Sequence, residues 1–269
     1  SEEVHLCEDE DGVELLDVPT DAPRDIVVKD LSFSYTGSIG RPVLKNLNLV
    51  IPAGKMTAIV GESGSGKSTL MKLLLKFYAP TEGEIFLDGQ PLSCFSAKSM
   101  RRVTGIVMQD NFVFSDTIRR NIILGEAMDE GRLAAAVSAA CLEDYVKELP
   151  VGVETKVGSE GIGVSGGERQ RMMIARAVYK RPLYLMLDEA TSSLDAENER
   201  KITENLQAVF ADRTRIVIAH RLSTVRHADN ILVLHHGEIV EQGTHEQLVA
   251  NRGYYFELIH NQLELAEDK

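Results

Sequence analysis

Apolar and polar residues alternate along several short segments of this chain, and a period of two is typical of half-buried β-strands. Other segments are apolar at nearly every position, as expected of central parallel strands covered on both faces. The alternating segments are 26–35, 47–51 and 84–89; the continuous ones are 56–60, 183–187 and 215–219; a further strand is expected at 103–108, and a terminal hairpin from 231–234 and 238–241. Together they indicate a mostly parallel sheet with shorter alternating strands around it.

Between the expected strands the period changes to that of helices, with apolar residues three and four positions apart. Three successive segments of this kind, 117–124, 129–141 and 142–149, form a helical insert. Further helices are expected after residue 66, from 165 to 181, after residue 195, and near the C-terminus through Leu248 and Leu263. Strands that alternate with helices predict an α/β fold.

One glycine-rich stretch lies between an expected buried strand and an expected helix, and its spacing fits the phosphate-binding P-loop pattern without a gap. Glycines let backbone N–H groups point toward one centre, and the helix start adds unpaired donors and a partial positive charge. Lys67 would reach the β- and γ-phosphates of a nucleotide, and the Ser68 hydroxyl would hold Mg²⁺. The alternative is a glycine-rich turn that binds nothing. The stretch consists of Gly61, Glu62, Ser63, Gly64, Ser65, Gly66, Lys67, Ser68 and Thr69.

A second expected helix begins after Ser165 and carries two glycines in its first turn. Ser165 and Glu168 have the spacing of a capping box, so one interpretation is simply a well-capped helix. That interpretation leaves Gly166 and Gly167 unexplained, because glycine in a helix costs about 1 kcal/mol relative to alanine. The glycines make sense where a phosphate approaches bare backbone N–H groups. Such a helix start would close over a nucleotide held by the P-loop, in the same chain or in another one.

Polar side chains follow three expected strands at the edge where open α/β sheets bind ligands. Asp188 and Glu189 are adjacent, which suits a division of labour: Asp188 binds Mg²⁺ through water, and Glu189 polarises an attacking water. The alternative for this pair is a helix cap or two solvated charges. Gln109 and His220 each follow another strand. His220 is placed to contact a γ-phosphate, although a single histidine is more often structural.

Two more residues have both a structural and a functional interpretation. Tyr35 ends the first alternating strand, where its ring is either an ordinary core or edge aromatic or a stacking partner for a base. Asp195 precedes a helix and has the side chain of an N-cap, so capping and a functional role are both open.

Composition and charge limit the class of protein. With 269 residues, of which 43% are hydrophobic, the chain can bury a sizeable core, and no apolar run reaches the length of a membrane span. The net charge is −12, but residues 1–25 hold ten acidic side chains against Arg24 alone, a balance of −9 that leaves −3 for the remainder. A body without a basic stripe argues against nucleic acid as a partner. The acidic segment is expected to be a solvated linker that enters the folded domain at about Ile26.

The three cysteines are widely scattered and fit no metal spacing. They indicate unpaired thiols in a reducing compartment rather than a disulfide framework. Six histidines other than His220 also lack partners at ligand spacing, so no metal site is expected from them.

In combination, these motifs resemble the ATP-binding cassette, the nucleotide-binding domain of ABC transporters, over roughly residues 24–265. Order and spacing agree throughout. Residues 61–69 match Walker A; 183–188 with Glu189 match Walker B; Gln109 matches the Q-loop, 164–168 the signature, 193–195 the D-loop, His220 the switch histidine, and Tyr35 the A-loop aromatic that stacks on adenine. This last match favours the base-stacking interpretation of Tyr35.

The departures from the family pattern are small. Val164 replaces the usual leucine of the signature and Glu168 the usual glutamine, while Ser165 and Gly167 are intact. Two further stretches resemble the exporter branch: residues 114–122, which follow the Q-loop, and residues 155–161, the X-loop. In the family these stretches lie near the coupling helices of the membrane domain.

The resemblance implies a P-loop NTPase (RecA-like) core with an antiparallel β subdomain and a helical subdomain at about 110–180. It implies a head-to-tail dimer of two nucleotide-binding domains, in which Ser165, Gly166 and Gly167 of one chain, with Asp195 of the D-loop nearby, close on ATP held by the other. It also implies that residues 1–24 are the cut end of a linker from a missing transmembrane domain. The location would be the cytoplasmic face of the cell membrane.

The leading hypothesis is an Mg²⁺-dependent ATPase that powers export. Phosphoryl transfer needs mainly placement and charge neutralisation. In this hypothesis Gln109, Ser68 and Asp188 position the metal and its waters, Lys67 and His220 hold the γ-phosphate, and Glu189 activates water. The exported substrate is open among peptides, lipids and drug-like compounds.

Two rival hypotheses belong to other classes. A soluble cassette of DNA repair or translation typically carries a long coiled-coil insert or a second cassette, and this sequence has neither. A catalytically silent nucleotide-binding module is opposed by the intact Glu189 and His220.

Overall fold

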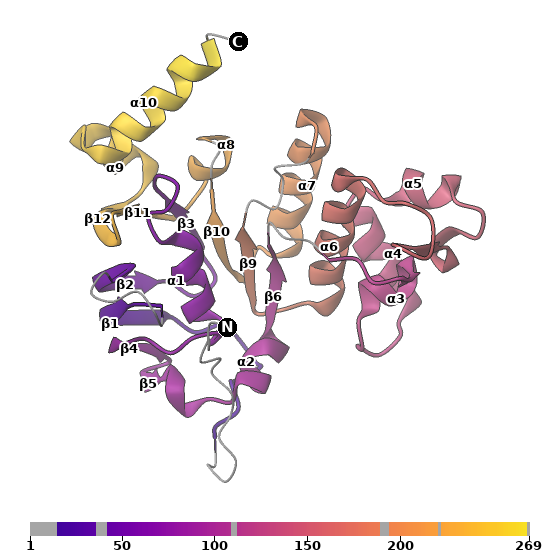
Figure 1. Cartoon of the computed structure of the whole chain (residues 1–269), viewed down its shortest axis with the longest axis horizontal. Coiled ribbons are helices and arrows are strands. Elements are labelled where there is room, and N and C mark those ends of the chain that lie inside the picture. Colours follow the sequence, from indigo (N-terminus) through magenta and orange to yellow (C-terminus); the bar gives the residue numbers. More distant parts are fainter. Residues whose placement is uncertain (1–14, 36–41, 109–111, 189–193, 220–221, 268–269) are drawn as a thin grey trace. The chain divides into compact units, whose positions relative to one another are not determined.

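The structure is a computed structural model that describes residues 15–35, 42–108, 112–188, 194–219 and 222–267. They form two compact units (Figure 1). Unit 1 comprises Ser1–Thr104 and Asp212–Lys269, and unit 2 comprises Gly105–Ala211.

An antiparallel sheet in unit 1 has the strand order β2-β1-β4-β5. Its strands are β1 (Ile26–Phe33), β2 (Leu44–Ile51), β4 (Glu82–Leu87) and β5 (Gln90–Pro91). The alternation predicted for these segments is confirmed in β2, where Leu47, Leu49 and Ile51 are buried and the residues between them are exposed. Asp88 and Gly89, with φ of 53° and 75°, form the two-residue turn between β4 and β5 that the Asp-Gly pair predicts.

A second set of strands in unit 1 has the order β12-β11-β3-β10. Its members are β3 (Met56–Val60), β10 (Thr214–Ile218), β11 (Asn230–His235) and β12 (Glu238–Gly243). β10 and β11 pair in parallel with opposite sides of β3, and β12 pairs antiparallel with β11. All residues of β3 are buried, as expected of a central parallel strand. The predicted parallel core and terminal hairpin are therefore confirmed.

Helices connect or follow these strands in unit 1, and its α-helices are labelled in Figure 1. They are α1 (Lys67–Leu74), the 3-10 helix η1 (Leu92–Cys94), α2 (Ala97–Val103), α8 (Leu222–Val225), α9 (His245–Asn251) and α10 (Tyr254–Glu267). The sequence pattern predicts α1, α9 and α10 but not α2.

Contacts with the folded unit begin before the expected entry point at about Ile26. The Leu16 N–H donates to the Cys94 carbonyl at 2.8 Å, and the Ser96 N–H donates to the Leu16 carbonyl at 2.9 Å. Val18 is buried, with 2% of its surface exposed. Leu16 is thus held at the η1–α2 region by its backbone, while its side chain is 50% exposed, and Val18 is the buried apolar residue of this segment.

Unit 2 carries the predicted helical insert. Its elements are β6 (Thr104–Val107), β7 (Asp116–Thr117), α3 (Ile118–Ile123), α4 (Glu130–Ala139), α5 (Glu143–Glu148), the 3-10 helix η2 (Gly152–Glu154), β8 (Lys156–Val157), α6 (Gly166–Lys180), β9 (Tyr184–Asp188) and α7 (Ala196–Val209). β6 and β9 are neighbours in a sheet, and β7 pairs antiparallel with β8. The three helices of the insert are confirmed to within a few residues.

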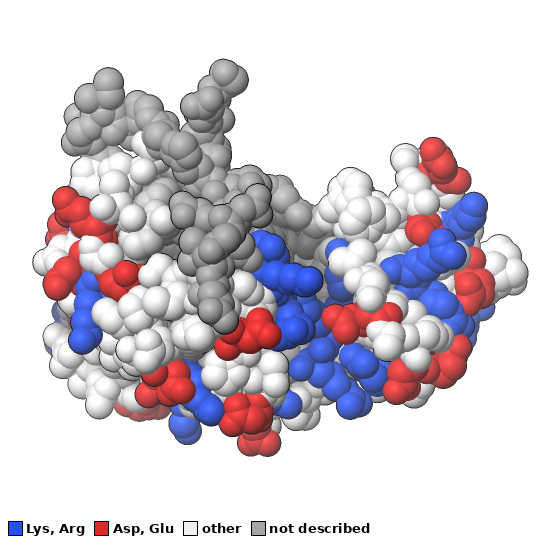
Figure 2. Space-filling view, turned by 90° about the horizontal axis from the view of Figure 1, so that it is seen from below, with Lys and Arg blue, Asp and Glu red and all other residues white. Residues whose placement is uncertain are grey.

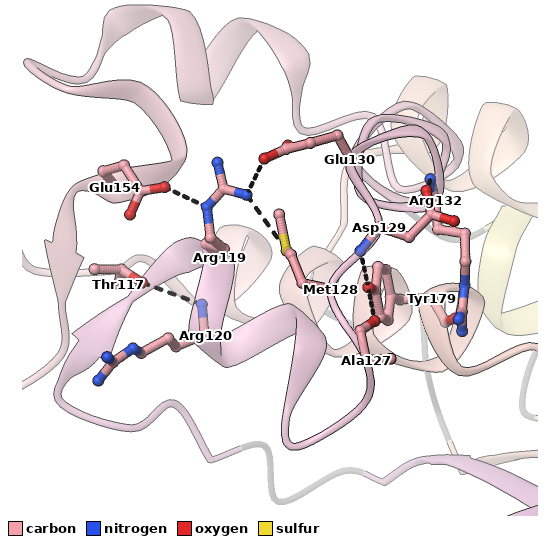
Figure 3. A network of polar contacts seen from close by, with 10 residues as sticks. All are labelled: Thr117, Arg119, Arg120, Ala127, Met128, Asp129, Glu130, Arg132, Glu154 and Tyr179. Carbon is pink, nitrogen blue, oxygen red and sulfur yellow. Dashed lines mark hydrogen bonds and ion pairs between the residues drawn. The ribbon is translucent and has the colours of Figure 1, made fainter.

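Polar contacts around Arg119 and Tyr179 hold the helical part of unit 2 together (Figure 3). Arg119 forms ion pairs with Glu154 and, at 2.6 Å, with Glu130. The Tyr179 hydroxyl accepts a hydrogen bond from the Asp129 N–H at 2.9 Å and donates one to the Ala127 carbonyl at 2.5 Å. The buried Tyr179 side chain thus ties its hydroxyl to two backbone groups of the loop before α4, and both hydrogen bonds are part-buried.

Charges of both signs lie close together on the face of the molecule in Figure 2, where blue groups neighbour red ones. Such interspersed charges favour solubility without a large field of one sign. Among the described helices, none has the length and apolar composition needed to cross a bilayer.

Candidate functional site

The P-loop connects β3 to α1 in unit 1, in the predicted strand, loop and helix context. Gly61, Gly64 and Gly66 have φ of 150°, 79° and 108°, a region that L side chains rarely adopt. A Cβ on Gly61 would lie 2.0 Å from the carbonyl oxygen of Leu234, and one on Gly66 would lie 2.6 Å from Cδ2 of Leu44. The loop therefore takes this path only because these positions lack side chains.

The groups that line the loop fit a phosphate. Lys67 Nζ donates to the carbonyl oxygens of Gly61 at 2.9 Å and Glu62 at 2.7 Å, so the ammonium lies within the loop. α1 begins after Gly66, which offers no capping side chain, so its first N–H groups can bind an anion. Ser65 Oγ is buried and has no hydrogen-bond partner among the residues that the structure describes. A cation, an unpaired hydroxyl and an uncapped helix start thus meet in one place.

Two further predicted ligands belong to the same unit. Ser68 is exposed although the residues on either side of it are buried, which suits a metal ligand. Tyr35 Oη lies 3.1 Å from Thr69 Oγ1, and the Tyr35 ring packs edge-on against Phe33 and Tyr78. The structure therefore brings Tyr35 and the P-loop together.

The second predicted helix start is α6 in unit 2. Ser165 is its N-cap: its hydroxyl accepts from the Glu168 N–H at 3.3 Å, and the Glu168 carboxylate accepts from the Ser165 N–H at 2.8 Å. The predicted capping box is confirmed. Gly166 is exposed and Gly167 is partly exposed, so bare backbone faces solvent at this helix start. Capping explains the serine and the glutamate but not the two glycines.

The predicted acidic residues of unit 2 occupy two different environments. Asp188 is the last residue of β9 and is buried, with 6% of its surface exposed, after four apolar residues. Asp195 is the N-cap of α7 and accepts from the Asn198 N–H at 3.0 Å. This hydrogen bond is the main reason that the pKa of Asp195 is lowered. The capping role predicted for Asp195 is therefore confirmed.

Several predicted site residues remain untested by the geometry. Gln109, Glu189 and His220 lie outside the described residues. Ser68 belongs to unit 1 and Asp188 to unit 2. In the described part of the chain, no group of three or more His, Cys, Asp or Glu side chains could hold a metal ion by itself. A metal site made from one hydroxyl, one amide and one carboxylate stays a prediction.

The turn between β11 and β12 contacts the P-loop, which the sequence pattern does not predict. His236 and Gly237, with φ of 49° and 83°, form this two-residue turn. The Gly237 N–H donates to the Ser65 carbonyl at 3.1 Å, and the Gly237 carbonyl accepts from the Lys45 N–H at 2.8 Å. The His-Gly pair signals a hairpin turn, but nothing in the sequence points to its neighbour across the fold.

A buried parallel strand, a glycine loop that holds Lys67, and an uncapped helix define a P-loop nucleotide-binding protein. A family model described as "ABC transporter" matches residues 44–192, which is more than half of the chain. The chain belongs to the ABC transporter family.

Curated relatives of this chain include exporters. It is 48% identical over 245 residues to an ATP-dependent lipid A-core flippase of Syntrophus aciditrophicus (strain SB), across 91% of this chain and 40% of the relative. A second relative is named as a multidrug export ATP-binding/permease protein of Staphylococcus aureus (strain NCTC 8325 / PS 47). The two sequences are 46% identical over 232 residues, across 86% of this chain and 40% of the relative. The chain thus spans about two fifths of the length of these relatives.

A solved structure of a bacterial Atm1-family ABC exporter with ATP bound matches this chain with a TM-score of 0.85 and 40% identity. The match covers 94% of this chain and 46% of that one. The predicted fold, an α/β P-loop core with an antiparallel β part, is therefore confirmed, and so is the predicted resemblance to exporters.

Proposed function

We propose that this chain is the ATP-binding and ATP-hydrolysing domain of an ABC exporter. The observation that carries the proposal is the P-loop, where the Lys67 ammonium, the buried Ser65 hydroxyl and the uncapped start of α1 converge. The exporter names of the relatives, and the ATP-bound exporter that this chain resembles, support it.

Binding follows from the groups around the loop. Lys67 and the N–H groups of residues 61–69 hold the β- and γ-phosphates, and the Tyr35 ring stacks on adenine. Mg²⁺, when bound, neutralises charge between the phosphates. Ser68, Asp188 and Gln109 would hold it directly or through water.

Hydrolysis needs a group that prepares the attacking water. Glu189 follows the buried Asp188 in the sequence and is the proposed base, which orients the water and accepts its proton. His220 follows β10 and is proposed to contact the γ-phosphate. Placement and charge neutralisation of this kind are what phosphoryl transfer requires.

A second copy of the domain would complete each site. The exposed backbone at Gly166 and Gly167 is suited to contact a phosphate that lies outside its own chain. We therefore propose a head-to-tail dimer in which Ser165 and these glycines close on the partner's ATP, with Asp195 of the D-loop at the same interface.

The membrane partner is also a proposal. In unit 2, Phe112 and Phe114 are 65% and 44% exposed and stack edge to face at 4.9 Å, and such exposed apolar side chains favour a docking surface. We propose that they face a transmembrane domain, which would place this domain on the cytoplasmic face of the membrane. The exported substrate would be a lipid, a peptide or a drug-like compound.

The test is the ATPase rate as a function of chain concentration, with Glu189→Gln as the control against a contaminating ATPase. A rate that rises faster than linearly and is lost in the variant supports sites assembled from two chains. A variant that hydrolyses ATP near the unmutated rate would remove Glu189 from its role. Stimulation of the rate by nucleic acid would instead favour a soluble cassette of DNA repair or translation.

A further inference from the structure

The P-loop rests on the end of β11 and on the turn that follows it, all within unit 1. The Gly237 N–H donates to the Ser65 carbonyl, and Gly61 packs so closely on the Leu234 carbonyl that no side chain fits between them. Both contacts involve backbone atoms. The position of this turn therefore sets the position of the loop.

An aromatic stack of His235, His236 and Tyr254 covers this turn. The ring centroids of His235 and Tyr254 are 4.3 Å apart, and those of His235 and His236 are 4.0 Å apart. Nδ1 of His235 is buried and has no hydrogen-bond partner in the described part of the chain, so the two ring contacts are the interactions seen for this imidazole there. Tyr254 is the first residue of α10, the C-terminal helix in Figure 1.

The hydroxyl of Tyr254 lies beside the P-loop itself. Burial first, and then the neighbouring Glu62 carboxylate, raise the pKa of Tyr254 to about 12. The hydroxyl is buried and has no hydrogen-bond partner among the described residues. Through the contact of its ring with His235, Tyr254 thus reaches the turn that donates to Ser65.

The attachment of α10 does not depend on the Tyr254 side chain. The Tyr255 N–H donates to the Glu241 carboxylate at 2.6 Å, and Tyr255 is buried with 1% of its surface exposed. The Tyr255 hydroxyl contacts His245 Nδ1 of α9 at 2.7 Å. A substitution at Tyr254 should therefore leave the start of α10 in place.

We propose that Tyr254 is a positioning residue of the nucleotide site, which holds the P-loop in its phosphate-binding conformation through the contact of its ring with His235. Because Tyr254 begins α10, this contact makes nucleotide affinity depend on the order of the C-terminal helix. The inference rests on the proposed function, since it takes residues 61–69 as the nucleotide site.

The test measures the dissociation constant of Mg²⁺ and N-methylanthraniloyl-ADP with the full chain, a probe that requires no hydrolysis. We expect Tyr254→Ala to weaken binding about fivefold, in the range of one lost aromatic contact. Tyr254→Phe keeps the ring and should stay within about twofold of the unmutated chain. Tyr255→Phe is the matched control: it removes a tyrosine hydroxyl from the same helix, away from the loop, and should leave affinity unchanged.

A double-mutant cycle separates positioning from general loss of stability. If both side chains act through the stack, adding His235→Ala to Tyr254→Ala should weaken binding no further. In the unmutated chain and Tyr255→Phe, amide hydrogen exchange at residues 62–66 should be equally slow, and it should accelerate in His235→Ala. This second variant decides the question if Tyr254→Ala does not fold.

The outcomes are distinct. An unmutated chain that does not bind the probe contradicts the proposed function. A chain that binds it, with Tyr254→Ala or His235→Ala within twofold and loop exchange unchanged, overturns the positioning role alone.

Discussion

Two glycines of the same loop should differ sharply in their tolerance of alanine. Both Gly61 and Gly64 have positive φ, so alanine at either position costs about 1 kcal/mol in backbone strain. Their surroundings differ. A Cβ on Gly64 has nothing within 4 Å, whereas one on Gly61 would lie 2.0 Å from the backbone carbonyl oxygen of Leu234.

The collision sets the size of the difference. A backbone carbonyl cannot rotate away as a side chain can, so relief at Gly61 requires β11 or the loop to move. Overpacking of this kind costs about 2 kcal/mol. We therefore expect Gly61→Ala to lower the free energy of unfolding by about 3 kcal/mol and Gly64→Ala by about 1 kcal/mol.

The assay is thermal unfolding of the full chain without nucleotide, followed by circular dichroism. For a chain of this size about 3 °C accompanies each kcal/mol, so the expected losses in Tm are about 9 °C and about 3 °C. Omitting nucleotide removes any effect of lost binding on Tm. Equal losses for the two variants would refute the reasoning, because they would show that Leu234 does not constrain Gly61.

Three further predictions concern unit 2. Tyr179→Phe removes two part-buried hydrogen bonds, each of which contributes about 1 kcal/mol, and should lower the free energy of unfolding by about 2 kcal/mol in urea titrations; an unchanged midpoint would contradict the contacts in Figure 3. Ser165→Ala removes the cap of α6 and should lower the free energy of unfolding by about 1 kcal/mol and the ATPase rate about 100-fold. Ser165→Asp keeps a capping side chain and should restore stability but not hydrolysis. If it restores both, capping is the only role of Ser165. Because the pKa of Asp195 lies below its ordinary 3.8, its charge contributes to stability fully above about pH 4 and the contribution is lost as the pH falls through the lowered value. Asp195→Asn keeps a capping side chain and should flatten this part of the Tm-versus-pH curve, so an identical curve in the variant would argue against the charge.

Elements that depend on local pattern could be predicted from the sequence. β3 agrees with the predicted strand 56–60, and the helices of the insert agree to within a few residues. Burial on one or both faces fixes the periodicity of β3, α3 and α4, whereas α5 has no fully buried residue. The pairing of β7 with β8 was missed, since each strand has only two residues and the partners are some 40 positions apart. α2 was missed as well: its cap at Ser96 follows another serine and a cysteine, a stretch that is typical of loops.

A glycine in β4 marks a bulge rather than a turn. The sequence Thr81-Glu82-Gly83 is typical of a turn because of its glycine, but Glu82 and Gly83 belong to β4. Gly83, with φ of 74°, lies opposite Asp30, with φ of 48°, where the register of β1 and β4 shifts. Glycine marks a bulge here, since a Cβ would lie 2.3 Å from the Asp30 carbonyl oxygen.

In the candidate site, too, some residues could be predicted from the sequence and others could not. Its ligand-facing residues could be predicted because chemistry fixes their type: a cation at Lys67 and a hydroxyl at Ser68 serve the same nucleotide in any surroundings. The groups behind the loop carry no such constraint, since a backbone carbonyl such as that of Leu234 is supplied by any residue. Their identity depends on a fold that brings positions about 170 residues apart into contact.

The three glycines of the P-loop therefore differ in how well each position should tolerate a side chain. At Gly64 only the backbone conformation disfavours a side chain, whereas at Gly61 and Gly66 a side chain would also collide with Leu234 and Leu44, respectively. A substitution of Leu44 by a smaller residue removes the Cδ2 contact and should therefore make alanine at position 66 less costly. The strain at φ 108° and the 3.3 Å approach to the Val43 carbonyl oxygen would remain. No change at Leu234 can do the same for position 61, because the obstacle there is the main chain.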